Sequence, residues 1–251
     1  MSDTALFQYV LGLADDQLVL GHRLSQWTGR APILEEELAL GNIALDLIGQ
    51  ARGLYQYAGE LEDAGRDEDV LAYHRDARGY LNLTLVEQPN GDFAQTIARQ
   101  LFYTAMALPF WQAMTASTDQ RLAAVAAKAE KEAAYHLRHA TEWIARLGDG
   151  TEESHRRMQA AIHQLWEFTG ELFKMNAAEI GLAAANIAPD RISLRFVWNR
   201  TITAALDEAT LTRPNDSWMA EGGRDGLHGE DLGHMLAEMQ SLQRMHPRLS
   251  W

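Results

Sequence analysis

The sequence predicts an all-α fold, a bundle of long helices with additional C-terminal helices. Apolar residues recur at helical spacing through most of the chain, and no segment alternates apolar and polar residues between turn signals as a half-buried strand would. The predicted helices are about 20 to 30 residues long with short connections, which is the pattern of a helical bundle. No linker, repeat or low-complexity tract divides residues 1–251, so we expect one domain with a C-terminal extension over about residues 190–251.

The first two helices form the start of the predicted bundle. The first covers about residues 4–28 and ends at Gly29. The second begins near Pro32, which a first helical turn tolerates, and the acidic run 35–37 favours the positive end of a helix dipole. Over residues 38–49 this helix is apolar on nearly every side, which predicts a central helix wrapped by its neighbours.

The middle of the chain predicts two more helices. A polar connection over residues 62–69 leads into a third helix over residues 70–86. Asp92 is a plausible N-cap for the fourth helix. Pro109 lies inside that helix and should bend it near Ala105, because proline lacks an N–H and clashes with a preceding carbonyl.

The rest of the chain predicts five more helices and a glycine-rich segment before the last of them. Ser117 with Gln120 forms a second capping pair for a fifth helix over residues 118–147. The longest segment without helical periodicity is 213–229, and its glycines favour a flexible surface loop over a phosphate cradle. The other predicted helices cover residues 151–175, 176–186, 192–212 and 230–245.

Composition excludes several classes of function. The chain has no cysteine, which excludes disulfides, thiolate zinc sites, iron–sulfur clusters and cysteine nucleophiles. A net charge of −13 and a pI near 5.1 disfavour nucleic-acid and anionic-membrane partners, which need clustered Lys and Arg. No apolar run approaches a membrane span and no basic N-terminal region precedes an apolar stretch, so we expect a cytoplasmic protein.

A bundle of long helices without cysteine can hold a carboxylate-bridged di-metal centre. Such a centre needs Glu-x-x-His pairs, so we searched the sequence for that spacing. Only Glu152 with His155 fits that spacing, and these residues fall in an opening turn where a solvated helix start is the better interpretation. Asp231 with His234 opens the last helix in the same way. Glu132 lies four residues before His136, and we interpret that histidine as a core residue.

Asn42 and Asp46 are the polar side chains in the apolar centre of the second helix. A buried carboxylate must find a partner or take up a proton, because burying an isolated charge costs several kcal/mol. We therefore interpret Asn42 and Asp46 as a structural polar network with an arginine, in preference to a catalytic acid.

Several long motifs resemble the C subunit of the multicomponent ring-1,2-phenylacetyl-CoA epoxidases of bacterial phenylacetate degradation. The resemblance spans nearly the whole chain. It implies a ferritin-like fold and a place beside the A subunit, which holds the di-iron centre and epoxidises the aromatic ring of the CoA thioester. The motifs that carry the resemblance are Arg30–Pro32, Asn42–Arg52, Leu85–Phe93, Lys131–His136 and Met235–Gln240.

The resemblance also implies that this chain has lost the metal ligands of its A-subunit relatives. An Asp-Glu-x-Gly-His string of the A subunit reads here as Asp46 to Gln50, and a Lys-Glu-Glu-x-x-His string as Lys131 to His136. One histidine among amides, a hydroxyl and apolar side chains lacks the carboxylates that hard iron ions need. We therefore expect no catalytic residue, no metal and no cofactor in this chain. The degenerate ligand positions are Gln17, Leu47, Gln50, Thr104, Ala133 and His136.

The function implied by the resemblance is that of a non-catalytic structural subunit. Its expected partners are the catalytic A subunit, the small B subunit and, indirectly, a reductase, and a homodimer is compatible with the sequence. Two competing interpretations remain open. One is an autonomous di-metal carboxylate oxygenase that uses Glu132 and His136, and the other is a helical adaptor protein unrelated to oxygenation.

Overall fold

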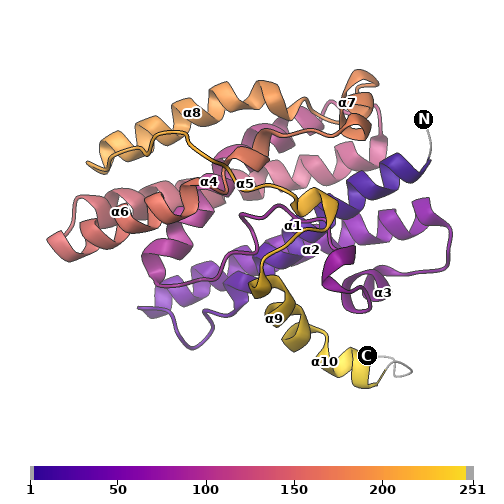
Figure 1. Cartoon of the computed structure of the whole chain (residues 1–251), viewed down its shortest axis with the longest axis horizontal. Coiled ribbons are helices and arrows are strands. Elements are labelled where there is room, and N and C mark those ends of the chain that lie inside the picture. The colour runs from indigo at the N-terminus through magenta and orange to yellow at the C-terminus, as the bar shows by residue number, and fades with distance from the viewer. Residues whose placement is uncertain (1–2, 247–251) are drawn as a thin grey trace.

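The computed structural model describes residues 3–246, and this part of the chain folds into α-helices joined by turns and short 3-10 segments (Figure 1). It contains no strand, which confirms the all-α prediction. The α-helices are α1 (Asp3–Ser25), α2 (Leu34–Glu62), α3 (Glu68–Tyr73), α4 (Phe93–Met114), α5 (Gln120–Gly148), α6 (Glu152–Trp166), α7 (Ala177–Ala184), α8 (Arg191–Glu208), α9 (Glu230–Met239) and α10 (Ser241–Met245).

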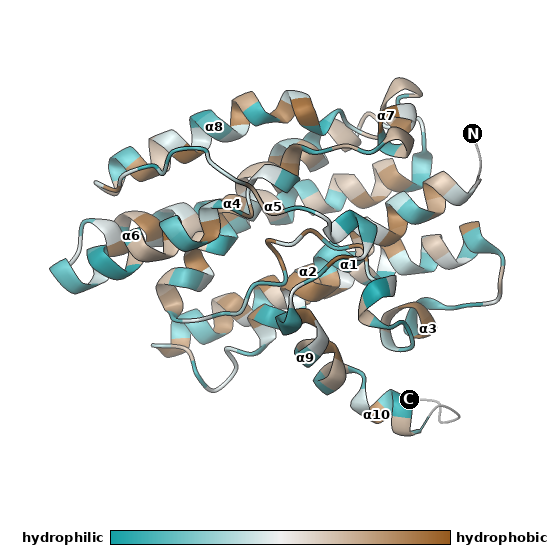
Figure 2. Ribbon diagram, viewed as in Figure 1, coloured by the Kyte–Doolittle hydropathy of each residue, from teal (hydrophilic) through white to brown (hydrophobic). Residues whose placement is uncertain are grey.

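Four long helices make the centre of the molecule, in the ferritin-like arrangement. Helix α1 packs along α2, α4 packs along α5, and the two pairs meet where α2 contacts α5. Helices α6 and α8 pack on α4, α7 packs on α1, and α9 and α10 extend from the opposite side (Figure 1). Hydrophobic and hydrophilic residues alternate along the helices (Figure 2). Among the described residues, no helix combines the length and hydropathy of a membrane span.

The helix starts are set by side-chain caps, and at one of them the expected capping residue is wrong. The carboxylate of Asp92 accepts a hydrogen bond from the backbone N–H of Gln95 at 3.0 Å, as expected for the N-cap of α4. Helix α5 is capped by Asp119, whose carboxylate accepts from the N–H of Leu122 at 3.0 Å. Ser117 instead lies before the cap, and its hydroxyl donates to the carbonyl of Ile187 at 2.6 Å.

The sequence predicts a third helix over residues 70–86, and this prediction is wrong for most of its length. Helix α3 ends at Tyr73, and most of the following segment to residue 92 crosses the bundle in irregular conformation with several apolar side chains fully buried. Its backbone N–H groups at Leu81, Leu83 and Thr84 donate to buried carboxylates at 2.7–2.8 Å. These charged acceptors satisfy the backbone in place of helical hydrogen bonds.

The C-terminal helices are shorter than their periodicity predicts. Helix α6 stops at Trp166, and the rest of the expected range 151–175 contains a 3-10 turn. The range 230–245 divides into α9 and α10 at Gln240. The amide of Gln240 is buried and donates to the carbonyls of Ala72 at 3.1 Å and Arg75 at 3.0 Å. The break between α9 and α10 thus coincides with the tertiary hydrogen bonds of Gln240.

Helix α2 is not wrapped on all sides, which corrects the expectation from its sequence. The side that faces α1 and α5 is buried, but three leucines on the opposite side are exposed. Leu34 is 67%, Leu38 60% and Leu45 68% accessible. The outer side of α2 therefore presents apolar side chains to solvent in this structure.

Candidate functional site

The six degenerate ligand positions lie on the four long helices of the bundle and are all buried. Gln17 is on α1, Leu47 and Gln50 on α2, Thr104 on α4, and Ala133 and His136 on α5. In the described part of the chain, no hydrogen bond joins any two of them. Each of the four polar members instead bonds to another group, so the positions are used for packing and helix-to-helix contacts.

Gln17 of α1 and Thr104 of α4 each donate a hydrogen bond to a residue of α4. The amide nitrogen of Gln17 donates to the hydroxyl of Tyr103 at 2.6 Å. The amide oxygen of Gln17 is buried and has no hydrogen-bond partner among the described residues. The hydroxyl of Thr104 donates to the backbone carbonyl of Gln100 at 2.6 Å, one turn earlier in α4. Neither side chain supplies a carboxylate to the centre of the bundle.

His136 lies at the contact between α5 and α2, where its Nε2 is 3.0 Å from the carboxylate of Asp46. Burial lowers the pKa of His136 and outweighs the opposing effect of Asp46, so the ring is neutral at pH 7 and its Nε2–H donates. The expectation of an arginine as the partner of Asp46 is therefore wrong. Asn42 is exposed, so it does not belong to a buried network.

Two more polar pairs join α2 to α5. The amide nitrogen of Gln50 donates to the carboxylate of Glu132 at 2.7 Å, and Glu36 pairs with His139 at 2.8 Å. Glu132 also pairs with Lys128 at 3.2 Å. The carboxylates of this region are therefore occupied in contacts between and along helices.

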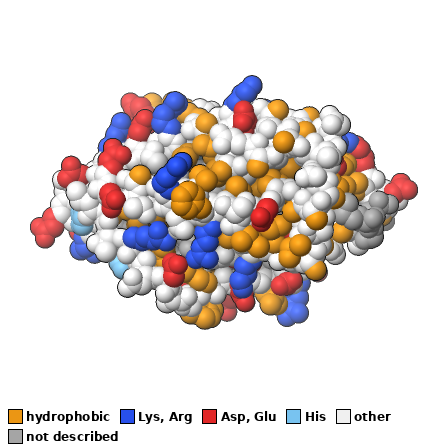
Figure 3. Space-filling model, turned by 90° about the horizontal axis from the view of Figure 1, so that it is seen from above, with side chains coloured by type: hydrophobic (Ala, Val, Ile, Leu, Met, Phe, Trp, Pro, Cys, Tyr) orange, Lys and Arg blue, Asp and Glu red, His pale blue; other side chains and the backbone are white. Residues whose placement is uncertain are grey.

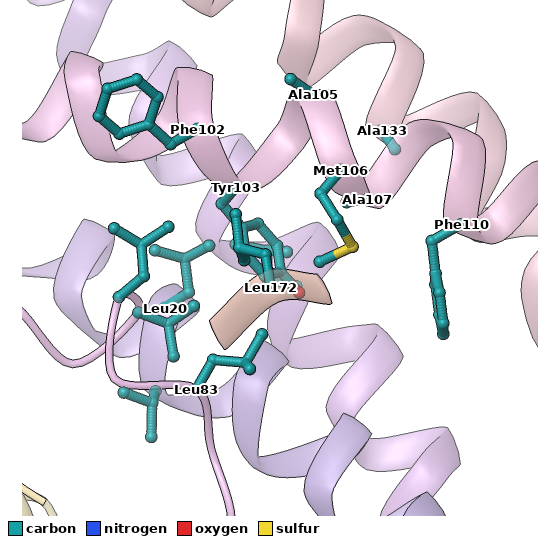
Figure 4. Close-up of a cluster of buried hydrophobic side chains, with 14 of the residues drawn as sticks. Leu20, Leu83, Phe102, Tyr103, Ala105, Met106, Ala107, Phe110, Ala133 and Leu172 are labelled. Atoms are coloured by element: carbon teal, nitrogen blue, oxygen red, sulfur yellow. The ribbon is translucent and has the colours of Figure 1, made fainter. Parts of the chain in front are cut away.

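The donor set does not suit a di-metal centre. No group of three or more His, Asp or Glu residues is placed to hold a metal ion within the described residues. Leu47 and Ala133, at positions where the resemblance implies lost carboxylates, belong to the buried apolar core. Figure 4 draws Ala133 in one hydrophobic cluster with Met106 and Phe110 of α4. Apolar packing replaces charges that would otherwise lie buried without a counter-ion.

The other histidine pairs considered as metal ligands are helix starts. Thr151 caps α6 together with Ser154, and the Nδ1 of His155 is 2.7 Å from the carbonyl of Gly148. The side chains of Asp231 and His234 are exposed at the start of α9. Neither pair converges on a common point in the core.

Buried ion pairs that the sequence did not predict involve Asp15 and Asp16 of α1. The carboxylate of Asp15 accepts from both terminal nitrogens of Arg75 and from the hydroxyl of Tyr55. The carboxylate of Asp16 accepts from Arg224, at 2.6 Å for the shorter contact. Both aspartates lie in an otherwise apolar stretch of the sequence. Charged residues are rarely buried unless they are paired, so their position in this stretch is the sequence signal that could have revealed the ion pairs.

The glycine-rich segment is fixed by Glu171 and is neither a free loop nor a phosphate cradle. One carboxylate oxygen of Glu171 accepts from the backbone N–H groups of Gly222 at 3.0 Å and Gly223 at 2.8 Å. A Cβ on Gly223 would lie 2.1 Å from the carbonyl oxygen of Asn82, so only glycine allows this close approach. The N–H groups that a phosphate would need are already bound by the protein.

His228 holds the end of the same segment. Its Nδ1 is 2.7 Å from the carboxylate of Glu87, and its Nε2 is 2.8 Å from the carbonyl of Tyr80. Both neighbours are acceptors, so both ring nitrogens must donate and the ring is an imidazolium. Burial opposes this charge, but the hydrogen bonds and the charge of Glu87 outweigh it and raise the pKa of His228.

We expect this contact to make stability depend on pH. The folded-state pKa of His228 is raised above its unfolded value, so its contribution is complete below about pH 6.5 and is lost as the pH rises through the raised pKa. Urea unfolding of the wild type and of His228→Ala across that range should show a difference between them that shrinks with increasing pH. A difference that stays constant would contradict the charged state.

The comparisons with known proteins agree with the fold. The family described as "Phenylacetic acid catabolic protein" matches residues 1–251. The chain is 51% identical over 246 residues to the C subunit of the 1,2-phenylacetyl-CoA epoxidase of Escherichia coli (strain K12). This match covers 98% of the chain and 99% of the relative.

Proposed function

The chain belongs to the phenylacetic acid catabolic protein family, and from this membership we propose that it is a non-catalytic structural subunit of a 1,2-phenylacetyl-CoA epoxidase. In this proposal it pairs with a catalytic A subunit, which holds the di-iron centre, and assembles with a small B subunit. A reductase supplies electrons to the catalytic subunit. The similarity to a C subunit over almost the full length of both chains supports the assignment.

The observation that carries the non-catalytic role is the chemistry of the six degenerate ligand positions. Among them only His136 is a usual metal ligand, and it already pairs with Asp46. A di-iron centre needs several carboxylates to offset the metal charge and to bridge the two ions. Leucine and alanine cannot supply them.

A structural subunit acts through its surfaces, and the described part of the chain exposes apolar side chains on at least two faces. One is the outer side of α2. The other lies on α7 and α8, where Ile180, Ile192 and Phe196 are exposed, and Figure 3 shows hydrophobic side chains gathered on that side of the molecule. A rigid bundle that packs against the catalytic subunit can hold its helices, and thereby its metal ligands, in productive geometry.

Reconstitution tests this function. Ring epoxidation is measured with the catalytic subunit and the electron-transfer components, first alone and then with this chain added. We expect activity to rise when the chain is added, and we expect Asp46→Ala to raise it equally, because this residue has a structural contact only. A folded Asp46→Ala variant that abolishes activity would contradict the structural role.

Two further measurements separate the alternatives. Metal analysis of the purified chain should find far less than the roughly two ions per chain that a di-metal enzyme holds. A content near two would favour an autonomous oxygenase. Size-exclusion chromatography should show co-elution with the catalytic subunit, whereas a chain that never co-elutes would favour an unrelated adaptor.

A further inference from the structure

A cavity of about 300 Å³ opens to solvent where the start of α1, the start of α7 and the glycine-rich segment meet. Helices α1 and α7 contact each other in this region (Figure 1). The volume lies at the lower end of the range for small-molecule sites. The lining is partly apolar, from Ala5, Leu81 and Ala178, and partly polar, with Gln8, Tyr9 and Asp225 among the polar side chains.

Two buried ion pairs lie along this cavity and cancel their own charges. Arg224 pairs with Asp16 at 2.6 Å. Glu179 pairs with Arg191 at 2.7 Å. Gly12 gives Arg224 room to cross α1, because a Cβ there would lie 2.9 Å from one of its terminal nitrogens. A molecule in the cavity therefore meets little net charge from these four side chains.

Asp225 supplies the uncompensated charge of the lining. Its backbone N–H donates to the carbonyl of Gly222 at 2.9 Å, but its exposed carboxylate has no hydrogen-bond or ion-pair partner among residues 3–246. One carboxylate gives too few ligands for a metal ion, and no group of three His, Asp or Glu residues is placed to hold one in this part of the chain. The charge of the cavity therefore favours an organic cation.

Tyr9 adds a hydroxyl that the protein leaves unused. The side chain of Tyr9 lines the cavity and is 7% exposed, and its hydroxyl has no hydrogen-bond partner within the described residues. Burial raises the pKa of Tyr9, so the hydroxyl keeps its proton and can donate or accept. A buried hydroxyl without a partner costs free energy, which a ligand that bonds to it would recover.

We propose that this cavity binds a small aliphatic amine that carries a second polar group. The ammonium pairs with Asp225, and the second polar group forms a hydrogen bond with the hydroxyl of Tyr9. The carbon chain between them packs against Ala5, Leu81 and Ala178. Because charge, hydrogen bonding and apolar contact all contribute, the cavity discriminates against anions and against uncharged molecules of the same length.

Four probes with the same four-carbon chain test this selectivity: aminobutanol, butylamine, butanediol and hydroxybutyrate. NMR titration of the full-length chain measures each affinity, and the amides of Gln8 and Ala178 report binding in the cavity. We expect aminobutanol to bind most tightly, butylamine and butanediol to bind about three- to fivefold more weakly, and hydroxybutyrate to bind most weakly. Equal affinities for aminobutanol and butanediol, tighter binding of hydroxybutyrate, or no binding of any probe would overturn the proposal.

Two variants assign the contacts to their side chains. Asp225→Asn should weaken the binding of aminobutanol about threefold and leave that of butanediol unchanged. Tyr9→Phe should weaken aminobutanol about fivefold and leave butylamine unchanged. Asp207→Asn is the matched control, since Asp207 is an exposed aspartate of α8 outside the cavity, and it should change the affinity of no probe. Variants that weaken all the probes equally would contradict these contacts.

The stability of Tyr9→Phe gives a readout that does not depend on any ligand. The substitution should leave the free energy of unfolding of the ligand-free chain unchanged or raise it, because the hydroxyl that it removes has no partner in the protein. Urea unfolding measures this. A clear loss of stability would show that the hydroxyl is already bonded in the folded chain, and would overturn its role in binding a ligand.

Discussion

Replacing Asp15 with alanine should lower the free energy of unfolding by about 3–5 kcal/mol, because it leaves the guanidinium of Arg75 buried without a carboxylate. Asp15 is fully buried and Arg75 is 8% exposed. The substitution also removes the acceptor of the Tyr55 hydroxyl at 2.5 Å and of the Leu81 N–H at 2.8 Å. Urea unfolding followed by circular dichroism measures the loss, which is a large part of the stability of a typical domain.

An exposed pair provides the control for this prediction. Asp76 pairs with Arg244 at 3.0 Å, but its side chain is 88% exposed, so Asp76→Ala should change stability little. Asp15→Asn should fall between the two, since it keeps the shape and part of the hydrogen bonding while removing the charge. If Asp15→Ala were as stable as Asp76→Ala, the buried pair would contribute nothing to the fold.

The long helices could be predicted from the sequence because their apolar periodicity and their helix ends agree. Predictions over residues 4–28, 118–147 and 192–212 lie within a few residues of α1, α5 and α8. The prediction failed where tertiary contacts overrode local pattern. Residues 74–86 have the periodicity of a helix, yet carboxylates more than sixty positions away in sequence bind their backbone N–H groups. No local pattern contains that information.

At the candidate site, the sequence predicts which residues are buried but not which residues they contact. Burial of Leu47, Ala133 and His136 follows from their place in the apolar pattern of the long helices. The partner of Asp46 could not be predicted, because His136 is ninety positions away in sequence and only the meeting of α2 with α5 brings the two together. The exposure of Leu38 was equally hidden, since an apolar residue in an interface and one in a core give the same sequence signal.

The irregular segments are held in place by acids that each bind several donors. Glu87 accepts from His228, from the amide of Asn82 at 2.9 Å and from the N–H of Gly229 at 2.7 Å. Asp15 and Glu171 act in the same way elsewhere. The segments around residues 80–87 and 222–229 are therefore attached to the helices and to each other through carboxylates, where a helix would use its own backbone.

Glu171→Ala tests this attachment most severely. The carboxylate is 3% exposed and accepts from the N–H and hydroxyl of Thr84, at 2.8 and 2.7 Å, and from the N–H groups of Gly222 and Gly223. Alanine would leave the backbone donors of Thr84 and Gly223 buried without this acceptor, together with the half-buried N–H of Gly222. We expect a loss of about 3–5 kcal/mol in the free energy of unfolding, measured by urea denaturation.

Hydrogen exchange distinguishes this mechanism from general destabilisation. In Glu171→Ala the amides of Thr84, Gly222 and Gly223 should exchange much faster than those in the middle of α4, because the two segments separate locally before the bundle unfolds. Glu167→Ala is the matched control one turn earlier, since its backbone carbonyl still accepts from Ala220 and no hydrogen bond to its side chain is lost. Uniformly faster exchange across the long helices in Glu171→Ala would mean that this carboxylate supports the whole bundle and has no special relation to the two segments.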